Sequence, residues 1–381
     1  RNQVLAAMHR DQAFRRPYSP AESVNAVTVG AWHADGFEGD WADRRVDLLK
    51  GASVPSPLAT VAAGHKRAVK PEVFFPGGRQ LYHGPHLERG EPARFRVATS
   101  SRPPGLLVAA PGQAAMELGR TTFSRGTSNA TALASRCAGR AAERLAELRR
   151  EPGWERLTPE YLGVLLKALL VHGACWGAGA GHVGAAAQAA GPADARELQR
   201  VLNRFLGCGE VQAGRAWSAA DGRATVLAWD ELGDDEAHVY RLPLPACLNA
   251  VKEWRRLTVT LAWFTPVNPR HKNYRKAFLW ATVGEDERGK LRVEKAGLDV
   301  KTSQRGTVQH LVFEGEKATA YAEDEALVLK VNCKADAGKL TERVPYALAV
   351  SIEVAEGVAL PVYDQIELGL RVQVPPVRPP A

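Results

Sequence analysis

A serine at the start of a long alanine-rich helix is the feature that most constrains this chain. The segment Gly126-Thr127-Ser128-Asn129-Ala130-Thr131-Ala132 opens a helical pattern that continues to about Arg150. The first N–H groups of a helix lack partners inside the helix, and the helix dipole is positive there. These groups would stabilise an oxyanion that forms beside Ser128. Gly126 permits a tight turn, and the alanines allow the helix to be buried.

Three segments upstream of Ser128 carry further signals. Residues 24–31 form a β-branched run that ends in Val-Gly-Ala, which predicts a short buried strand of a parallel sheet. Residues 69–78 read Val-Lys-Pro-Glu-Val-Phe-Phe-Pro-Gly-Gly, and residues 104–112 read Pro-Gly-Leu-Leu-Val-Ala-Ala-Pro-Gly. Together with the serine segment they make an ordered series, which is more specific than any one of them.

This series resembles the subtilisin-like serine proteases, in which Val-Gly-Ala, Lys-Pro-Asp/Glu-Val-x-x-Pro-Gly and Gly-Thr-Ser-x-Ala follow one another. The resemblance implies that Ser128 is the nucleophile of a serine endopeptidase that works through an acyl-enzyme. The chain departs from the family at Ala132, where a proline is usual, and by an insertion between the two Pro-Gly segments. The insertion holds His83, His86 and Arg89, which either shape a substrate groove or, as we expect, are ordinary loop residues.

The resemblance also implies an aspartate and a histidine upstream of the serine, because the family's triad follows the order Asp, His, Ser. None of the histidines before Ser128 has the glycine-flanked setting of the family's histidine. These are His9, His33, His65, His83 and His86. We therefore expect this chain to be the C-terminal part of such a protease, with the Asp and His upstream of it. The isolated chain is then expected to be inactive, since serine is a weak nucleophile without a base.

The family's oxyanion donor is an asparagine that lies upstream of the Val-Gly-Ala strand. Asn2 lies in the corresponding region of this chain. Either Asn2 is that donor, or the donor precedes the chain. The rest of residues 1–22 is polar and is expected to be irregular.

The segment after the serine helix is predicted to be mostly helical. A helix with a capping residue and proline at its first position is expected from Thr158 to about Cys175. His172 near its end has no visible orienting acid, so a role as general base is not favoured. Residues 177–190 contain Gly179-x-Gly181-x-x-Gly184, but they follow a helix rather than a strand, so we interpret them as a flexible loop. A short helix is predicted from Asp194 to about Leu206.

From about residue 215 the apolar residues alternate with polar or small ones, which is typical of strands. The alternation is clearest in four segments, residues 257–263, 327–333, 346–354 and 366–372. It predicts an antiparallel β-sandwich or jelly roll. The fold class is therefore α/β, with the C-terminal part of a subtilisin-like parallel-sheet domain followed by this β domain. The expected domains are residues 1–214 and 215–375, with a Pro-rich tail at 376–381.

Composition limits the remaining functions. No apolar run approaches the roughly 20 residues of a membrane-spanning helix. The five cysteines are far apart and form no Cys-x-x-Cys pair, which disfavours disulfides and zinc sites and favours a reducing, cytoplasmic compartment. Cys137 and Cys333 lie at apolar positions and are expected in the core. No P-loop, cofactor motif or metal-ligand cluster is visible.

A net charge of +8 permits acidic partners, and the most basic cluster is residues 270–276. We interpret this cluster as a solvated loop; the alternative is a phosphate-binding patch in which Tyr274 stacks on a base. The expected partners are a polypeptide substrate and a protein that binds the β domain, without a membrane or nucleic acid. Two alternatives to the protease are a non-catalytic protease-like binding or regulatory module and a nucleic-acid-associated protein that uses the 270–276 cluster.

Overall fold

The computed structural model describes residues 1–41, 43–84, 94–191, 193–215, 220–322 and 325–372. By its contacts the chain forms two compact units. Unit 1 comprises Arg1–Ala138 and Ala174–Val211, and unit 2 comprises Gly139–Gly173 and Gln212–Ala381. The chain passes from unit 1 to unit 2 between Ala138 and Gly139, inside the serine helix. The domain boundary expected at residues 214 and 215 stays a prediction.

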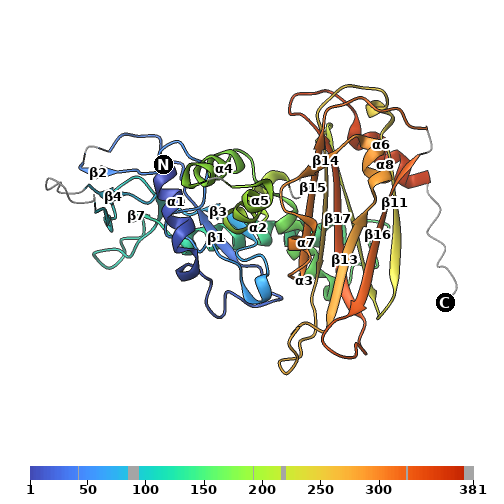
Figure 1. The fold of residues 1–381 in the computed structure, drawn as a ribbon, viewed down its shortest axis with the longest axis horizontal. Helices are drawn as coiled ribbons and strands as arrows, with labels where there is room; N and C mark the ends of the chain where they lie inside the picture. The colour runs from blue at the N-terminus through green and yellow to red at the C-terminus, as the bar shows by residue number, and fades with distance from the viewer. Residues whose placement is uncertain (42, 85–93, 192, 216–219, 323–324, 373–381) are drawn as a thin grey trace. The chain divides into compact units, whose positions relative to one another are not determined.

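Unit 1 is built on a four-stranded sheet with the order β1-β3-β9-β8 (Figure 1). Its strands are β1 (Val29–Trp32), β3 (Val73–Pro76), β9 (Gly209–Val211) and β8 (Ala174–Cys175). Strands β1, β3 and β9 run parallel, and β8 is an antiparallel edge strand. The strand predicted from residue 24 therefore exists, although it begins only at Val29.

Three helices pack together with this sheet, namely α1 (Asn2–Arg10), α4 (Gly179–Ala190) and α5 (Ala195–Leu206). Their shared core contains Leu5 of α1, Val183 of α4, Phe205 of α5 and two sheet residues, Trp32 and Phe74. The α5 prediction is confirmed, and Asp194 caps the helix by accepting a hydrogen bond from the Glu197 N–H at 2.7 Å.

Two predictions in unit 1 are wrong. Residues 1–22, expected to be irregular, begin with α1 and a 3₁₀ turn at Asp11–Phe14. Residues 177–190, interpreted as a flexible loop, contain α4. Six alanines give α4 a high helix propensity, and the burial of Val183 and Ala186 offsets the cost of its glycines.

Several short strands of unit 1 precede the serine helix in the chain. One sheet has the order β2-β4-β5, and β6 and β7 form a hairpin. Their bounds are β2 (Arg45–Val46), β4 (Tyr82–His83), β5 (Arg96–Val97), β6 (Leu106–Ala109) and β7 (Thr121–Ser124), with a 3₁₀ turn at His65–Arg67. Helix α2 (Thr127–Leu148) follows β7 directly, which confirms the predicted serine helix.

Unit 2 contains two antiparallel sheets, with the orders β10-β17-β12-β15-β14 and β11-β16-β13. The strands are β10 (Arg223–Leu232), β11 (Ala237–Pro243), β12 (Arg255–Trp263), β13 (Ala277–Val283), β14 (Glu294–Ala296), β15 (Val308–Gly315), β16 (Ala326–Ala335) and β17 (Val344–Val354). Both sheets contribute to one core, in which Leu257 and Val350 of the first sheet pack with Leu279 and Val331 of the second. The predicted strands at 257–263, 327–333 and 346–354 are confirmed.

Helices cover parts of these sheets. Helix α3 (Pro159–His172) packs on β12, β15 and β17, and α8 (Val362–Val372) packs on β10 and β11. The predicted strand at 366–372 is therefore wrong. Unit 2 also has α6 (Glu285–Leu291), α7 (Val300–Ser303) and 3₁₀ turns at Ala213–Arg215 and Ala246–Leu248. Within the described residues, none of the helices has the length and apolar character needed to span a membrane.

Candidate active site

Ser128 is exposed in the first turn of α2. The preceding Gly126 has φ +138°, a backbone conformation that glycine adopts readily. Its N–H donates to the Gly77 carbonyl at 2.8 Å, and the Gly77 N–H donates to the Trp32 carbonyl at 3.0 Å. These bonds tie the serine turn to the carboxyl ends of β3 and β1. Open α/β sheets bind their ligands at this end of the strands.

Gly77 has no room for a side chain. A Cβ at this position would lie 2.4 Å from the Ala31 Cβ and 3.1 Å from the Gly126 carbonyl oxygen. The close approach of these three residues depends on glycine, because any larger residue would push the end of β3 away from the serine turn. The Pro-Gly-Gly sequence at 76–78 thus has a direct structural role beside Ser128.

Arg125 anchors the same turn from the other side. Its guanidinium donates to the carbonyls of Ser100, Arg102 and Pro104, with distances of 2.7 Å to Arg102 and 2.5 Å to Pro104. Burial, and then the positive charge of Arg45, lower the pKa of Arg125. The structure therefore brings the two Pro-Gly segments and the Val-Gly-Ala strand to the serine motif, as the resemblance implies.

Asn129, which follows the candidate nucleophile, also belongs to this arrangement. Its side-chain amide donates to the Gly77 carbonyl at 3.4 Å, and the residue is half-buried. The sequence Asn129-Ala130-Thr131 is formally a glycosylation acceptor, but the amide is used here to hold the turn. Sequence reasoning missed this contact and the contact of Gly77, because both depend on where β3 ends in space.

One histidine–aspartate pair follows β1, and both ring nitrogens of its histidine are already bonded. His33 Nε2 lies 2.8 Å from Asp47 Oδ1, and both side chains are almost completely buried. His33 Nδ1 accepts from the Gln80 N–H at 3.3 Å, so Nε2 carries the proton that is donated to Asp47. Burial, the largest single influence, would raise the pKa of Asp47, but the hydrogen bond and charge of His33 together with the Leu49 N–H and Arg79 outweigh it, so the pKa is lowered. With both ring nitrogens bonded, His33 has none left for a serine hydroxyl.

Two further candidates, Asn2 and His83, lie exposed in the described part of the chain. Asn2 lies exposed at the start of α1, a helix that packs on α4, and its role as oxyanion donor stays a prediction. His83 is exposed on β4 in the predicted insertion. His86 and Arg89 lie outside the described residues.

His172 has a structural role instead of a catalytic one. It is buried at the C-terminal end of α3, with Nδ1 2.8 Å from Thr260 Oγ1 and Nε2 2.5 Å from Ser351 Oγ. Burial, followed by the nearby His310, holds the pKa of His172 well below its ordinary value. A neutral ring with both nitrogens hydrogen-bonded fits the expectation that it is not a general base.

The basic cluster at 270–276 is largely used inside unit 2. Arg275 pairs with Asp336 at 2.9 Å and donates to the carbonyls of Gln304 and Gly306. Lys276 lies 3.4 Å from Glu342. These partners account for two of its cations.

The described residues contain no group of three His, Cys, Asp or Glu side chains placed to hold a metal ion. None of the five cysteines forms a disulfide, and Cys137 and Cys333 are buried in the core as predicted. Burial raises the pKa of Cys208 and of Cys333, so neither thiol is activated.

Comparisons with solved structures carry no argument about the fold. The chain is similar to the "acidic stable capsid structure of Helicobacter pylori bacteriophage KHP30" at 14% identity, covering 34% of this chain and 90% of the other with a TM-score of 0.17. It is also similar to a structure of black queen cell virus at 9% identity, covering 35% and 70% with a TM-score of 0.14.

The sequence comparisons are more informative. The chain is 28% identical over 271 residues to the uncharacterized protein y4bN of Sinorhizobium fredii (strain NBRC 101917 / NGR234), covering 69% of this chain and 54% of that protein. It thus spans about half the length of this curated relative. The model of the subtilase family matches residues 4–209, which is more than half of the 381 residues and includes Ser128. The chain therefore belongs to the subtilase family.

Proposed function

We propose that this chain carries the nucleophile, Ser128, of a subtilisin-like serine endopeptidase. The observation that carries the proposal is the placement of Ser128, exposed at the start of α2 and tied through Gly126 and Gly77 to the carboxyl ends of parallel strands. A hydroxyl at this position can attack a peptide carbonyl and form an acyl-enzyme, which water then hydrolyses. The unpaired N–H groups of the first turn of α2 would face the developing oxyanion.

The proposed base that accepts the proton of Ser128 lies outside this chain. Two buried histidines, His33 and His172, have no ring nitrogen left to accept it, since each is bonded through both. The triad's Asp and His are therefore proposed for a segment upstream of Arg1, in agreement with the family's order of residues. The proposed second oxyanion donor is Asn2 or an asparagine of that segment.

Active-site labelling tests the nucleophile. A fluorophosphonate probe is expected to label the full-length protein at Ser128, and the Ser128→Ala variant should not be labelled. Ser135→Ala is the matched control, because Ser135 is exposed on the same helix. Equal labelling of Ser128→Ala and the parent protein would contradict the assignment.

The isolated chain of residues 1–381 is expected to be catalytically inactive, because its serine has no adjacent base. Casein and short fluorogenic peptides are suitable substrates. Hydrolysis by the isolated chain that Ser128→Ala abolishes would show that a base exists within the chain. A protein that is inactive at full length, with Ser128 unlabelled, would instead favour the non-catalytic module.

We infer that unit 2 is a β-sandwich accessory domain of the jelly-roll type. Its strand pairs are nested along the chain, as in a long hairpin that has been rolled up. The first of the eight strands pairs with the last (β10·β17), the second with the seventh (β11·β16) and the third with the sixth (β12·β15). This nesting and the core shared by both sheets support a double-sheet arrangement.

A further inference from the structure

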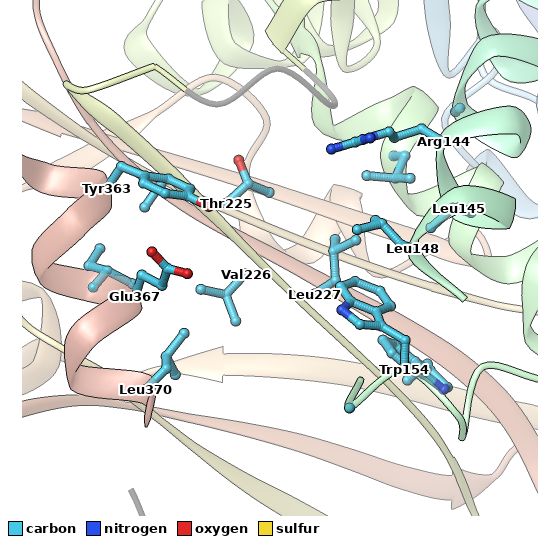
Figure 2. A pocket seen from close by; sticks show the side chains of 16 residues that line it. Arg144, Leu145, Leu148, Trp154, Thr225, Val226, Leu227, Tyr363, Glu367 and Leu370 are labelled. Carbon is cyan, nitrogen blue, oxygen red and sulfur yellow. The ribbon is translucent and has the colours of Figure 1, made fainter. Parts of the chain in front are cut away.

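A pocket of about 440 Å³ lies within unit 2 along strand β10 (Figure 2). Leu145 and Leu148 of α2, together with Trp154, line one side of it, and Tyr363 and Leu370 of α8 line the other. Its lining is mostly apolar, with a few polar groups, as in most ligand sites. Ser128 is not among its lining residues, so the proposed catalytic chemistry does not account for it.

The floor of this pocket is the edge of a sheet. Strand β10 is the terminal strand of the order β10-β17-β12-β15-β14, and no second strand pairs with it within the described residues. The Val354 N–H donates to the Gly222 carbonyl at 2.9 Å, which makes these two residues a hydrogen-bonded pair. Because such pairs alternate along antiparallel strands, the backbone groups of Thr225, Leu227 and Trp229 point away from β17. These outward N–H and C=O groups can form hydrogen bonds with the backbone of another extended segment, as at other sheet edges.

The two walls offer separate positions for the side chains of such a strand. Thr225 Oγ1 lies 2.7 Å from Ser351 Oγ, and Trp229 stacks on Trp154 at 5.2 Å, so the odd-numbered residues face the α3 side of the sheet. Val226 packs against the core on the α8 side. Successive side chains of an added strand would alternate between the same two sides. Apart from a few polar groups, among them Arg144 and Glu367, both sides are apolar, so most side chains of both sets are expected to be apolar.

The pocket also has a charge that a ligand can complement. Arg144 lies on the α2 side, and Figure 2 shows it across β10 from Glu367 of α8. Arg144 pairs with Glu147 at 2.7 Å, but both side chains are more than half exposed. An exposed pair at this helical spacing is worth only about 0.2–0.5 kcal/mol, so an acidic ligand can displace it. Arg144 would therefore select a carboxylate on the side of the added strand that faces α2.

We propose that β10 binds a short extended segment of a partner polypeptide, apolar along its length and acidic near Arg144, by adding it as a further antiparallel strand. The backbone groups of β10 supply affinity, and the walls formed by α2 and α8 select the side chains. This inference does not depend on proteolysis. It gives unit 2 the role of a docking module.

A peptide array tests the proposal with the Ser128→Ala form of the whole chain, in which cleavage cannot remove the ligand. The probes are capped hexapeptides with Val, Ile, Leu or Phe at five positions and Glu at the sixth. Binding of a subset of them is expected, and each bound sequence should weaken when Gln replaces Glu. Arg144→Glu should weaken binding about tenfold, which corresponds to the loss of one charged contact. Arg140→Glu, one turn earlier on α2 and outside the pocket, should leave binding unchanged.

Backbone methylation distinguishes an added strand from simple apolar binding. The best peptide is prepared with methyl groups on one set of alternate amide nitrogens, and separately on the other set. Only the set that faces β10 should matter, and its methylation is expected to weaken binding tenfold or more, about the effect of losing two hydrogen bonds. Leu227→Pro, which removes one outward N–H, should weaken binding, whereas Leu227→Ala retains that N–H and should weaken it less.

Three results would overturn the proposal. The first is equal binding of both methylated forms and the parent peptide, which would indicate a pocket for small apolar molecules. The second is the absence of binding by any apolar array member above a polar Ser/Gly hexapeptide. The third is a dimer of the chain in sedimentation that Leu227→Pro abolishes and no peptide displaces, which would assign the edge to a second copy.

Discussion

At the scale of one residue, the hydrogen bonds and burial of His172 determine its protonation state. Thr260 Oγ1 lies 2.8 Å from both His172 Nδ1 and His310 Nδ1, so one hydroxyl bridges two buried imidazoles. Ser351 occupies the other nitrogen of His172. Burial, then the proximity of His310, Arg215 and Arg223, lower the pKa of His172 and keep it neutral in the folded protein.

The first prediction concerns the pH dependence of stability. In the unfolded chain His172 binds a proton below about pH 6.5, whereas in the folded chain it stays neutral until much lower pH. The unfolded state therefore binds more protons, so stability is lost as pH falls below that value, by about 1.4 kcal/mol per pH unit. Urea unfolding of the parent chain at pH 7.5, 6.5 and 5.5 measures this slope.

The matched variants are His172→Gln and His83→Gln, since His83 is exposed on β4. His172→Gln should reduce the slope between pH 6.5 and 5.5 by the contribution of one proton, and His83→Gln should not change it. An unchanged slope in His172→Gln would mean that the imidazole is protonated in the folded state and that its surroundings rearrange to accept the charge.

The serine motif was predictable at this scale because Gly126, Thr127 and Ser128 are adjacent in the chain. The residues that hold the motif in place were not. Gly77 contacts Ala31 and Gly126, each about 50 residues away, and only the parallel pairing of β1 with β3 brings them together. No local pattern distinguishes such a glycine from an ordinary turn glycine.

At the scale of elements, α8 explains why one strand prediction failed. Apolar residues occur at 366, 368, 370 and 372, which fits a strand with a period of two. Positions 366 and 370 also lie one helical turn apart, so the same residues fit a helix face. The structure places Ile366 in the core, whereas Leu368 is 64% exposed. A strand would have put both on the same side.

The second prediction uses this difference. Ile366→Ala should destabilise unit 2 by about 2–5 kcal/mol, because it leaves a cavity in a close-packed core. Leu368→Ala should change stability by less than about 0.5 kcal/mol, because the side chain is mostly in water. Guanidinium unfolding of both variants measures the difference. Equal destabilisation by the two substitutions would favour the strand.

The apolar pattern of helix α3 predicts that the helix is buried, but it does not predict which sheet the helix packs on. Its start at Pro159 and its apolar character were predictable, and its position before residue 214 assigned it to the expected protease domain. Its buried residues include Val164, Leu165 and Ala168, and they group instead with unit 2, against β12 and β17. A helix that is apolar on most sides can cover any sheet that offers a matching face. The choice here is made by polar partners distant in the chain.

At the scale of the whole molecule, the family was predictable because four short segments occur in a fixed order. The two-sheet character of the second half was predictable because alternation recurs in three long strands. The division into compact units was less accessible, since residues 139–173 belong to unit 2, whereas the following Ala174–Val211 return to unit 1 and complete its sheet. This passage of the chain between the two units depends on long-range contacts, and no change in amino-acid composition along the chain marks it.

The last prediction follows from the place of α3. The face of the five-stranded sheet that α3 covers includes Thr260, Ala349 and Ser351, all buried. Lys167 of α3 is also buried there, where its ammonium donates to Thr307 Oγ1 at 2.6 Å. Without α3 this face would meet water, and the hydroxyls that bind Lys167 and His172 would lose their partners. A fragment in which residues 139–173 are joined by a short Gly/Ser linker to residues 212–372, leaving out the unit 1 residues 174–211, should therefore unfold cooperatively at a clearly higher temperature than a fragment of residues 212–372.

Thermal unfolding by circular dichroism compares the two fragments, and binding of the dye ANS reports the exposed apolar surface. The shorter fragment should bind more dye, and a synthetic peptide of residues 154–173, added in excess, should raise its melting temperature by mass action. The same peptide with Val164→Asp should fail to do so, because Val164 is fully buried in the helix. Identical melting temperatures and dye binding for both fragments would mean that the sheets of unit 2 do not need α3, and that its burial there contributes nothing to their stability.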